Sequence, residues 1–492
     1  MLNDQSASPG LELRDPGLLK QDAFLASGWT ASRSGQRFDV VNPADGTLLA
    51  QVASLTAAQV EQAIADAAEA QRVWQEQTAK QRAGHLQRWF REIMAHVNDI
   101  ALILTAEQGK PMPEARGEVA YAASFIEWFA EEGKRAYGDI IPAPQSDKRI
   151  AVLKQPVGVC AAITPWNFPA AMITRKVAPA LAAGCSILVK PAEQTPLTAL
   201  ALAVLAERAG IPRGVLQIVT GDAREIGAVL TASDTVRKLS FTGSTEVGRL
   251  LSEQCAPTIK RLSLELGGNA PFIVFDDADI EAAIEGAVTS KYRNSGQTCV
   301  CANRFLVQDG IYEAFVERLA ERSAELRVGP GLDAATEQGP LIDMAALQNV
   351  QSLIHDAVEK GARVIVGGRP HPLGHTFFEP TVLCDVDTSM RLAREEIFGP
   401  VAPVFRFSTE DEAVALANDT EYGLAAYLYT RDISRVWRVS EALEYGMVGV
   451  NTGLISNEVA PFGGVKQSGL GREGSRYGLD EYLELKYLCM QV

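Results

Sequence analysis

The chain has 492 residues, of which 47% are hydrophobic and 22% are charged, a composition typical of a globular protein with two or three domains. Its formal net charge is −15 at pH 7, so there is no basic excess to neutralise phosphates, which argues against nucleic acid as a partner. An anionic ligand would need a local cationic pocket set against this global field.

The start of the chain and its cysteines argue against export and against a metal site. Residues 1–10 are polar and lack the layout of a secretory signal, and no apolar run approaches the ~18 residues of a membrane span. The seven cysteines are scattered, without CxxC pairs or clustered histidines. We therefore expect a cytoplasmic protein with no metal ion and no membrane partner.

Helices are the first elements predicted along the chain. Thr56, followed by Gln59 three residues later, has the pattern of a helix N-cap, and we expect helices over 57–76 and 114–134. From about residue 150, short apolar runs alternate with helical stretches, which predicts βαβ units and a parallel sheet. The strands expected in this first series are 186–189, 215–219 and 238–241, and the helices are 198–208 and 245–254.

A second series of the same kind begins after Pro271. Its expected strands are 272–275, 304–307, 364–366, 401–407 and 424–429. No internal repeat or low-complexity tract interrupts the chain. The predicted fold class is therefore α/β, with two doubly wound parallel-sheet domains.

Three motifs contain the residues that can carry chemistry. Cys299 ends the segment RNSGQTC, Glu265 lies in LELGG, and Asn167 lies in PWNFP. A thiolate can add to a carbonyl, a carboxylate can activate water, and a carboxamide N–H can stabilise the resulting oxyanion. Residues 261–266 alternate with period two, so Glu265 should point away from its leucine neighbours. All five histidines lie away from these motifs, so a Cys-His pair has no obvious base.

With these motifs the chain resembles the NAD(P)-dependent aldehyde dehydrogenase family over nearly its whole length, and within it the bacterial succinate-semialdehyde dehydrogenases. The resemblance implies a dinucleotide-binding domain over 1–134 and 154–265, a catalytic domain over 266–466, and an oligomerisation arm over 135–153 and 467–492. Residues 135–153 are expected to pair with 482–492 across a subunit contact, since exposed strand edges are usually completed by a partner. We therefore expect a homodimer or a homotetramer.

The cofactor is expected at the FTGST turn that follows a strand, because no G-x-G-x-x-G follows a first strand. By resemblance, Lys190 contacts the adenosine ribose, Glu193 lies beside its 2′ position, Glu396 binds the nicotinamide ribose and Phe398 packs there. The other cofactor contacts that the resemblance implies are Thr164, Pro165, Trp166, Gly221, Phe241, Gly243, Ser244 and Leu266. A carboxylate at the 2′ position favours NAD, whereas similar bacterial enzymes often use NADP. We expect NADP, with NAD accepted.

The resemblance also implies roles for the reacting residues. Cys299 forms a thiohemiacetal with the aldehyde, with Arg293 and the nicotinamide cation favouring its thiolate. Glu265 then activates the water that hydrolyses the thioester. Lys176 and Glu473 match positions that can relay protons, although a helix lysine and a charged loop residue are also commonplace.

An anionic substrate is indicated by the residues near the oxyanion donor. Pro169 suits the first turn of a helix, which would bring Phe168 and Arg175 to one face. Two guanidiniums, of Arg175 and Arg293, would bind a carboxylate, and the resemblance implies Ser456 as a third contact. The expected substrate is succinate semialdehyde. Glutarate semialdehyde, or another ω-carboxy aldehyde, is the alternative, because one methylene changes binding by only ~1–3 kcal/mol.

Three further possibilities stay open. A non-catalytic structural relative would have no need to retain Cys299, Glu265 and Asn167 together. A CoA-dependent member would pass the acyl group to a thiol and have less need of Glu265. Cys301 could form a disulfide with Cys299 under oxidation, but bridges between residues i and i+2 are strained, so a passive small residue is favoured.

Overall fold

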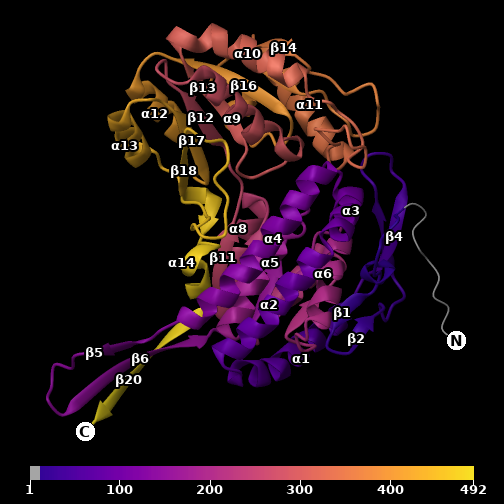
Figure 1. Ribbon diagram of the computed structural model, residues 1–492, viewed down its shortest axis with the longest axis vertical. Coiled ribbons are helices and arrows are strands. Elements are labelled where there is room, and N and C mark those ends of the chain that lie inside the picture. Colours follow the sequence, from indigo (N-terminus) through magenta and orange to yellow (C-terminus); the bar gives the residue numbers. More distant parts are fainter. Residues whose placement is uncertain (1–10) are drawn as a thin grey trace.

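The computed structural model describes residues 11–492, which form two α/β domains and a projecting arm (Figure 1). An eight-stranded sheet lies in the lower domain of Figure 1, a seven-stranded sheet lies in the upper domain, and the arm extends away from both. The predicted fold class is thus confirmed. Among the described residues no helix is both long and apolar enough to cross a bilayer.

The N-terminal part supplies small strands and a group of long helices. Its elements are β1 (Ala23–Leu25), β2 (Gly28–Thr30), β3 (Arg37–Val41), β4 (Leu48–Ala53), α1 (Ala57–Glu76), α2 (Ala79–Ala95), α3 (Val97–Gln108) and α4 (Met112–Glu132). Helix α1 begins as predicted, because the Thr56 side chain accepts from the Gln59 N–H and the Gln59 side chain accepts from the Thr56 N–H. Helix α4 lies two residues earlier than the predicted 114–134.

The first sheet has a parallel centre in the order β11-β10-β7-β8-β9. Its strands and helices are β7 (Val159–Ile163), α5 (Ala171–Ala183), β8 (Ile187–Lys190), α6 (Pro196–Arg208), β9 (Leu216–Ile218), α7 (Ala223–Ala232), β10 (Val236–Thr242), α8 (Thr245–Cys255) and β11 (Arg261–Glu265). Ile187 and Val189 pack into one core and Leu188 into another, so the sheet is covered on both faces. Pro169 lies before the first residue of α5, so the expectation that it occupies the first helical turn is wrong.

The second sheet has the order β14-β15-β16-β13-β12-β17-β18 and is parallel except for β14. Its elements are β12 (Ala270–Val274), α9 (Ile280–Tyr292), β13 (Ala302–Gln308), α10 (Tyr312–Ala324), α11 (Met344–Glu359), β14 (Arg363–Val366), β15 (Thr381–Val386), β16 (Val401–Phe407), α12 (Glu410–Asn418), β17 (Ala425–Tyr429), α13 (Ile433–Ala442) and β18 (Met447–Val450). All five predicted strands are present, and β15 and β18 are additional.

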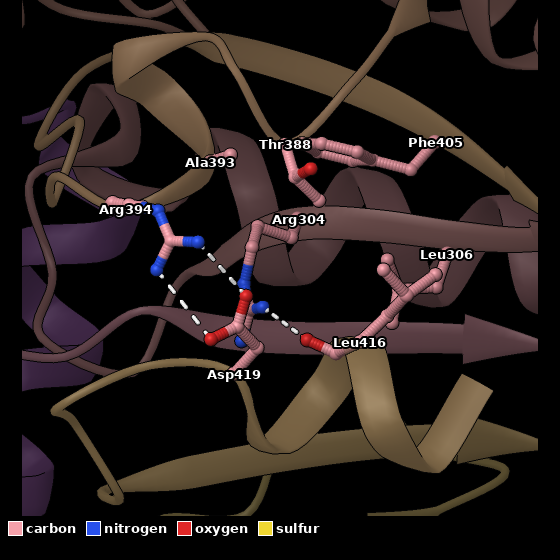
Figure 2. Close-up of a pocket in the computed structure, with 8 residues that line it drawn as sticks. All are labelled: Arg304, Leu306, Thr388, Ala393, Arg394, Phe405, Leu416 and Asp419. Atoms are coloured by element: carbon pink, nitrogen blue, oxygen red, sulfur yellow. Dashed lines mark hydrogen bonds and ion pairs between the residues drawn. The ribbon is translucent and has the colours of Figure 1, made fainter. Parts of the chain in front are cut away.

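Buried Arg304 ties β13 to the C-terminal end of α12 (Figure 2). Its guanidinium donates to the carbonyl of Leu416 at 2.6 Å, of Ala417 at 2.8 Å and of Asn269 at 3.1 Å. A cation is favourable there because the last carbonyls of a helix lack intrahelical partners. The arginine thereby fixes Asn269, which ends the turn between β11 and β12.

The arm is a three-stranded antiparallel sheet made within one chain. Strand β20 (Leu483–Gln491) pairs with β6 (Lys148–Pro156), which pairs with β5 (Asp139–Ile141). The expected pairing with 482–492 is present, but it does not cross a subunit contact, because α14 (Ser475–Asp480) delivers the chain directly beside β6. Within 467–492, strand β19 (Gly469–Leu470) joins the first sheet beside β11 instead of the arm.

Candidate active site

The site lies where the carboxyl ends of the first parallel sheet face the second domain. Strands β7 and β10 are neighbours, yet the chain continues from them in opposite directions along the sheet. Such a switch point leaves a crevice at the carboxyl ends of the strands. Two cavities, of about 310 and about 240 Å³, meet there, and both have Cys299 in their walls.

A left-handed turn presents Cys299 to these cavities. Asn294, Ser295 and Gly296, which follow α9, have φ values of 51°, 56° and 76°. The left-handed region is uncommon for residues other than glycine, so the surroundings must hold this turn. Glycine is needed at the third position, because a Cβ on Gly296 would lie 2.1 Å from the carbonyl oxygen of Gly399.

Hydrogen bonds from two segments hold the turn. The Asn294 N–H donates to the Glu114 carboxylate at 2.8 Å, and the Gln297 side-chain oxygen accepts from the Ile342 N–H at 2.9 Å. These contacts come from α4 and from the segment before α11. The nucleophile loop is therefore held by contacts from both domains.

Asn167 is held next to Cys299 through its side chain and its backbone. Its Nδ2 donates to the Gln297 carbonyl at 3.0 Å, while its own carbonyl accepts from Asn294 Nδ2 at 3.0 Å. The buried carboxamide and Cys299 line the same cavity. The N–H that Gln297 does not use is therefore a donor available to an oxyanion formed at the sulfur.

A buried ion pair supports Asn167 from behind. Lys110 Nζ lies 2.5 Å from the Glu118 carboxylate, 2.7 Å from the Asn167 carbonyl oxygen and 3.8 Å from the centre of the Phe168 ring. The other Glu118 oxygen accepts from the Ala170 N–H at 2.9 Å, at the start of α5. The pair thus fixes both ends of the turn between β7 and α5. Neither residue was predicted from the sequence as part of the site.

The surroundings of Cys299 keep its sulfur protonated. Burial, and then the charge of Glu396, raise the pKa of Cys299 to about 12, and the guanidinium of Arg175 opposes this shift. The sequence interpretation assigned this field to Arg293. The structure assigns it to Arg175, which lies deeper in the same cavity and has its guanidinium out of contact with water.

Glu265 is buried at the end of β11, on the side away from the packed leucines as expected. Its Oε2 has no hydrogen-bond partner among the described residues, and a Cβ on Gly463 would lie 2.9 Å from its Oε1. Burial and the charge of Glu473 raise the pKa of Glu265, whereas Arg175 and Lys176 lower it. A carboxylate with a raised pKa is a stronger base than an ordinary one, which suits it to activate water.

Lys176 and Glu473, which the sequence offered as a pair of relay residues, are in direct contact. Lys176 Nζ binds the Glu473 carboxylate and donates to Thr242 Oγ1 at 2.7 Å. Arg175 Nε lies 2.8 Å from the other Glu473 oxygen. Two cations of α5 therefore hold one buried carboxylate of the C-terminal segment.

The cavity of about 310 Å³ brings together the four predicted substrate residues. They are Phe168, Arg175, Arg293 and Ser456. The same cavity is also lined by Glu114, Gly117, Glu118 and Tyr121, which the sequence analysis missed. Their spacing of i, i+3, i+4 and i+7 on a predicted helix places them on one face, and this was the signal that could have found them.

The cavity of about 240 Å³ brings together most of the predicted cofactor residues. Pro165, Trp166, Gly243, Ser244, Leu266, Glu396 and Phe398 line it, together with Asn167. The Gly268 N–H donates to Glu396 at 3.1 Å, and burial raises the pKa of Glu396 to about 8. The Trp166 and Phe398 rings meet edge to face at 5.5 Å.

The other predicted cofactor residues lie outside this cavity. The Lys190 ammonium, at the end of β8, pairs with Glu193 at 2.8 Å, and the Lys190 backbone carbonyl accepts from the Thr164 N–H at 3.1 Å. Gly221 follows β9 at the same edge of the sheet. Phe241 lies in the core, where a Cβ on Gly243 would be 2.4 Å from its ring. Because side chains alternate along a strand, its neighbour Thr242 lines the cavity in its place.

A model of the aldehyde dehydrogenase family matches residues 29–488. The chain belongs to this family. Among the described residues no group of three or more His, Cys, Asp or Glu side chains is placed to hold a metal ion.

Curated members of the family are similar over almost the whole chain. The chain is 62% identical to the 3-sulfolactaldehyde dehydrogenase of Pseudomonas putida, with 98% of this chain and 99% of that one covered. It is 60% identical to a glutarate-semialdehyde dehydrogenase of Pseudomonas aeruginosa (98% and 99% covered) and 59% identical to the NADP(+) succinate-semialdehyde dehydrogenase of Escherichia coli (98% and 100%).

Solved structures of the family confirm the fold. The crystal structure of succinate-semialdehyde dehydrogenase from Burkholderia pseudomallei matches with a TM-score of 0.97 and 62% identity, covering 98% of this chain and 100% of that one. The two doubly wound domains and the arm are therefore the architecture of the family.

Cys301 is engaged away from the nucleophile. Its buried sulfur accepts from the Thr298 hydroxyl at 2.9 Å and lies 3.5 Å from the Lys291 carbonyl oxygen, and it forms no bond with Cys299. These contacts fit the passive role favoured from the sequence.

Proposed function

We propose that the protein oxidises an aldehyde with an anionic group at its far end, succinate semialdehyde above all, to the corresponding acid. The observation that supports this most strongly is the cavity in which Arg175, Arg293 and Ser456 line the walls together with Cys299. The relatives are named for three aldehydes that share an anionic end, namely succinate semialdehyde, glutarate semialdehyde and 3-sulfolactaldehyde. Glutarate semialdehyde remains the alternative substrate.

In the proposed reaction, Cys299 loses its proton to water as the aldehyde approaches, and Arg175 stabilises the resulting thiolate. The thiolate adds to the aldehyde carbon and gives a thiohemiacetal. The Asn167 amide and the Cys299 backbone N–H hold its oxyanion. A nicotinamide cofactor held in the smaller cavity would supply the hydride acceptor, and loss of the hydride would leave a thioester on the Cys299 sulfur. Glu265 takes a proton from the water that hydrolyses the thioester. Lys176 and Glu473, which contact each other behind this base, then carry the proton away.

We propose NADP as the preferred cofactor, with NAD accepted. The residues of the smaller cavity fit a dinucleotide, since the free N–H groups at the start of α8 suit a pyrophosphate and Glu396 suits ribose hydroxyls. The Lys190–Glu193 ion pair matters for the 2′ position of the adenosine ribose. The Glu193 carboxylate alone would repel a 2′-phosphate, and the positive charge of Lys190 offsets that repulsion. The Escherichia coli relative is named for NADP(+).

We also propose that the arm (β5, β6 and β20) serves assembly of a homodimer or homotetramer in the cytoplasm. The arm exposes Ile140, Leu485 and Tyr487, which are 84%, 70% and 61% accessible to water in the single chain. Strand β18 ends the second sheet with an unpaired edge. Apolar side chains and open strand edges of this kind are normally covered by another subunit.

Initial rates test the substrate and the cofactor together. Succinate semialdehyde, glutarate semialdehyde and butanal are each compared with NAD and with NADP. We expect higher kcat/KM for the two acidic aldehydes than for butanal, and higher values with NADP than with NAD. Equal kcat/KM for butanal would contradict the proposed anion pocket. Turnover that requires added CoA would contradict hydrolysis by Glu265.

A further inference from the structure

Arg175 occupies a position between the substrate cavity and the base. Its side chain is 1% exposed, and its guanidinium carbon lies 3.9 Å from the centre of the Phe462 ring. Nε is 2.8 Å from a Glu473 oxygen, but it is not aligned for a hydrogen bond, and Nη2 has no hydrogen-bond partner among the described residues. A buried guanidinium with an unused donor therefore lines the cavity on one side and faces Glu473 on the other.

Glu473 in turn lies close to Glu265 through the chain segment between them. Phe462 and Glu473 exchange two backbone hydrogen bonds of 2.8 Å. The next residue, Gly463, is the one whose Cβ would touch Glu265 Oε1. The two carboxylates are thus adjacent groups in one buried cluster, and Arg175 and Lys176 are the cations that contact Glu473 directly.

Arg293 has a different environment. It is half-buried at the end of α9, and its guanidinium carbon lies 5.4 Å from the centre of the Phe168 ring. It makes no ion pair among the described residues with Glu265 or Glu473. The two arginines of the cavity are therefore unequal, since only Arg175 also belongs to the carboxylate cluster.

We propose that Arg175 is a positioning residue that couples recognition of the substrate's anionic tail to the basicity of Glu265. This inference rests on the proposed function, because it requires a substrate with an anionic tail. A tail carboxylate bound at Nη2 competes with Glu473 for one guanidinium. Less positive charge then remains to balance the carboxylates of Glu265 and Glu473, so Glu265 binds its proton more tightly.

The charged groups around Glu265 determine the direction in which its pKa shifts when an anion binds Arg175. Burial and Glu473 raise its pKa, while Arg175 and Lys176 of α5 and Arg472 of the C-terminal segment lower it. Cys299 faces it from the second domain. Engaging Arg175 with an anion weakens one lowering contribution, so the pKa of Glu265 should rise. A substrate without the tail leaves that contribution in place.

The test is the pH dependence of acyl-enzyme hydrolysis, measured by quenching after a single turnover with butanal or with succinate semialdehyde. In the wild type, the rate of hydrolysis should fall at low pH as Glu265 becomes protonated. This acidic limb of the pH–rate profile should lie at higher pH for the succinyl enzyme than for the butyryl enzyme. In Arg175→Gln the butyryl limb should move to higher pH by up to about one unit, because the variant removes a charge that lowers the pKa of Glu265 without forming an ion pair with it, and direct pairing shifts a carboxyl pKa by about 1 to 3 units. Glu473→Gln should lower the limb, and the double variant should return it toward the wild-type position.

Two control variants separate this coupling from other effects. Arg175→Lys keeps the charge and should keep the butyryl limb near that of the wild type, whereas Arg72→Gln removes one exposed charge from α1 and should not move it. Two results together would overturn the coupling. The acidic limb of the butyryl enzyme would be unchanged in Arg175→Gln, and the succinyl and butyryl forms of the wild type would have the same acidic limb. If Arg175→Gln fails to fold, the wild-type comparison and Glu473→Gln still decide the question.

Arg293→Gln distinguishes failure of this inference from failure of the proposed function. If Arg293→Gln keeps the full preference for succinate semialdehyde over butanal, the anion pocket itself is wrong. If it loses that preference while Arg175→Gln leaves the butyryl limb in place, the pocket stands and only the coupling is wrong.

Discussion

Replacing Lys110 by Met tests whether the buried Lys110–Glu118 pair holds the oxyanion donor in place. The variant removes the ammonium that lies 2.5 Å from Glu118 and 2.7 Å from the Asn167 carbonyl oxygen. Removing one partner of a buried ion pair costs about 3–5 kcal/mol, because the remaining charge is uncompensated. The Asn167 turn also loses its donor, so the carboxamide should shift away from Cys299.

The double variant Lys110→Met/Glu118→Gln separates stability from catalysis. A glutamine oxygen can still accept from the Ala170 N–H, and neither position of the pair then carries an uncompensated charge, so most of the lost stability should return. The Asn167 carbonyl still lacks its lysine, so kcat should stay low. We expect a loss in kcat of at least about tenfold and at most the ~10²–10³-fold expected for removal of an oxyanion donor.

Initial rates and urea midpoints of the single and double variants, and of Asn167→Ala, provide the measurement. Adding Lys110→Met to Asn167→Ala should lower kcat no further, because both substitutions act on the same amide. A fully multiplicative loss in that combination would refute the reasoning. Recovery of kcat together with stability in Lys110→Met/Glu118→Gln would also refute it.

Three further predictions use the same assays. Arg293→Ala should raise KM for succinate semialdehyde about ten- to a hundredfold, because a hydrogen bond to a charged group contributes about 1.5 to 3 kcal/mol. The same variant should change KM for butanal little. Equal increases in KM for the two substrates would argue against a contact between Arg293 and the substrate carboxylate. The pKa of Glu396 is raised to about 8, so the carboxylate ionises as the pH rises through that value, and KM for the cofactor should fall over this range in the wild type but not in Glu396→Gln. Cys301→Ala should lose activity in peroxide as the wild type does, since the Cys301 sulfur is buried and engaged by Thr298; protection by the substitution would revive the disulfide switch.

The sequence predicted those features that depend on local patterns. Helix α1 was placed correctly because Thr56 and Gln59 form a capping box, and the strands were found because apolar runs alternate with helices. Glu265 could be oriented from period-two alternation alone. Resemblance to the family supplied Arg175 and Ser456, which no local pattern singles out.

The features that were missed depend on contacts between distant segments. Lys110 and Tyr121 look like ordinary helix residues until α4 is packed against the turn after β7. The left-handed turn at Asn294 and Ser295 is held by residues of both domains, so the local sequence does not reveal it. The position of β19 in the first sheet likewise depends on how the C-terminal segment returns to β11.

Mass spectrometry of the acyl enzyme tests the central claim most directly. Glu265→Gln is mixed with succinate semialdehyde and NADP, quenched and digested. We predict a burst of reduced cofactor equal to the number of active sites, together with one succinyl group on the peptide that carries Cys299. Absence of both the adduct and the burst, or undiminished turnover by Cys299→Ser, would contradict the account.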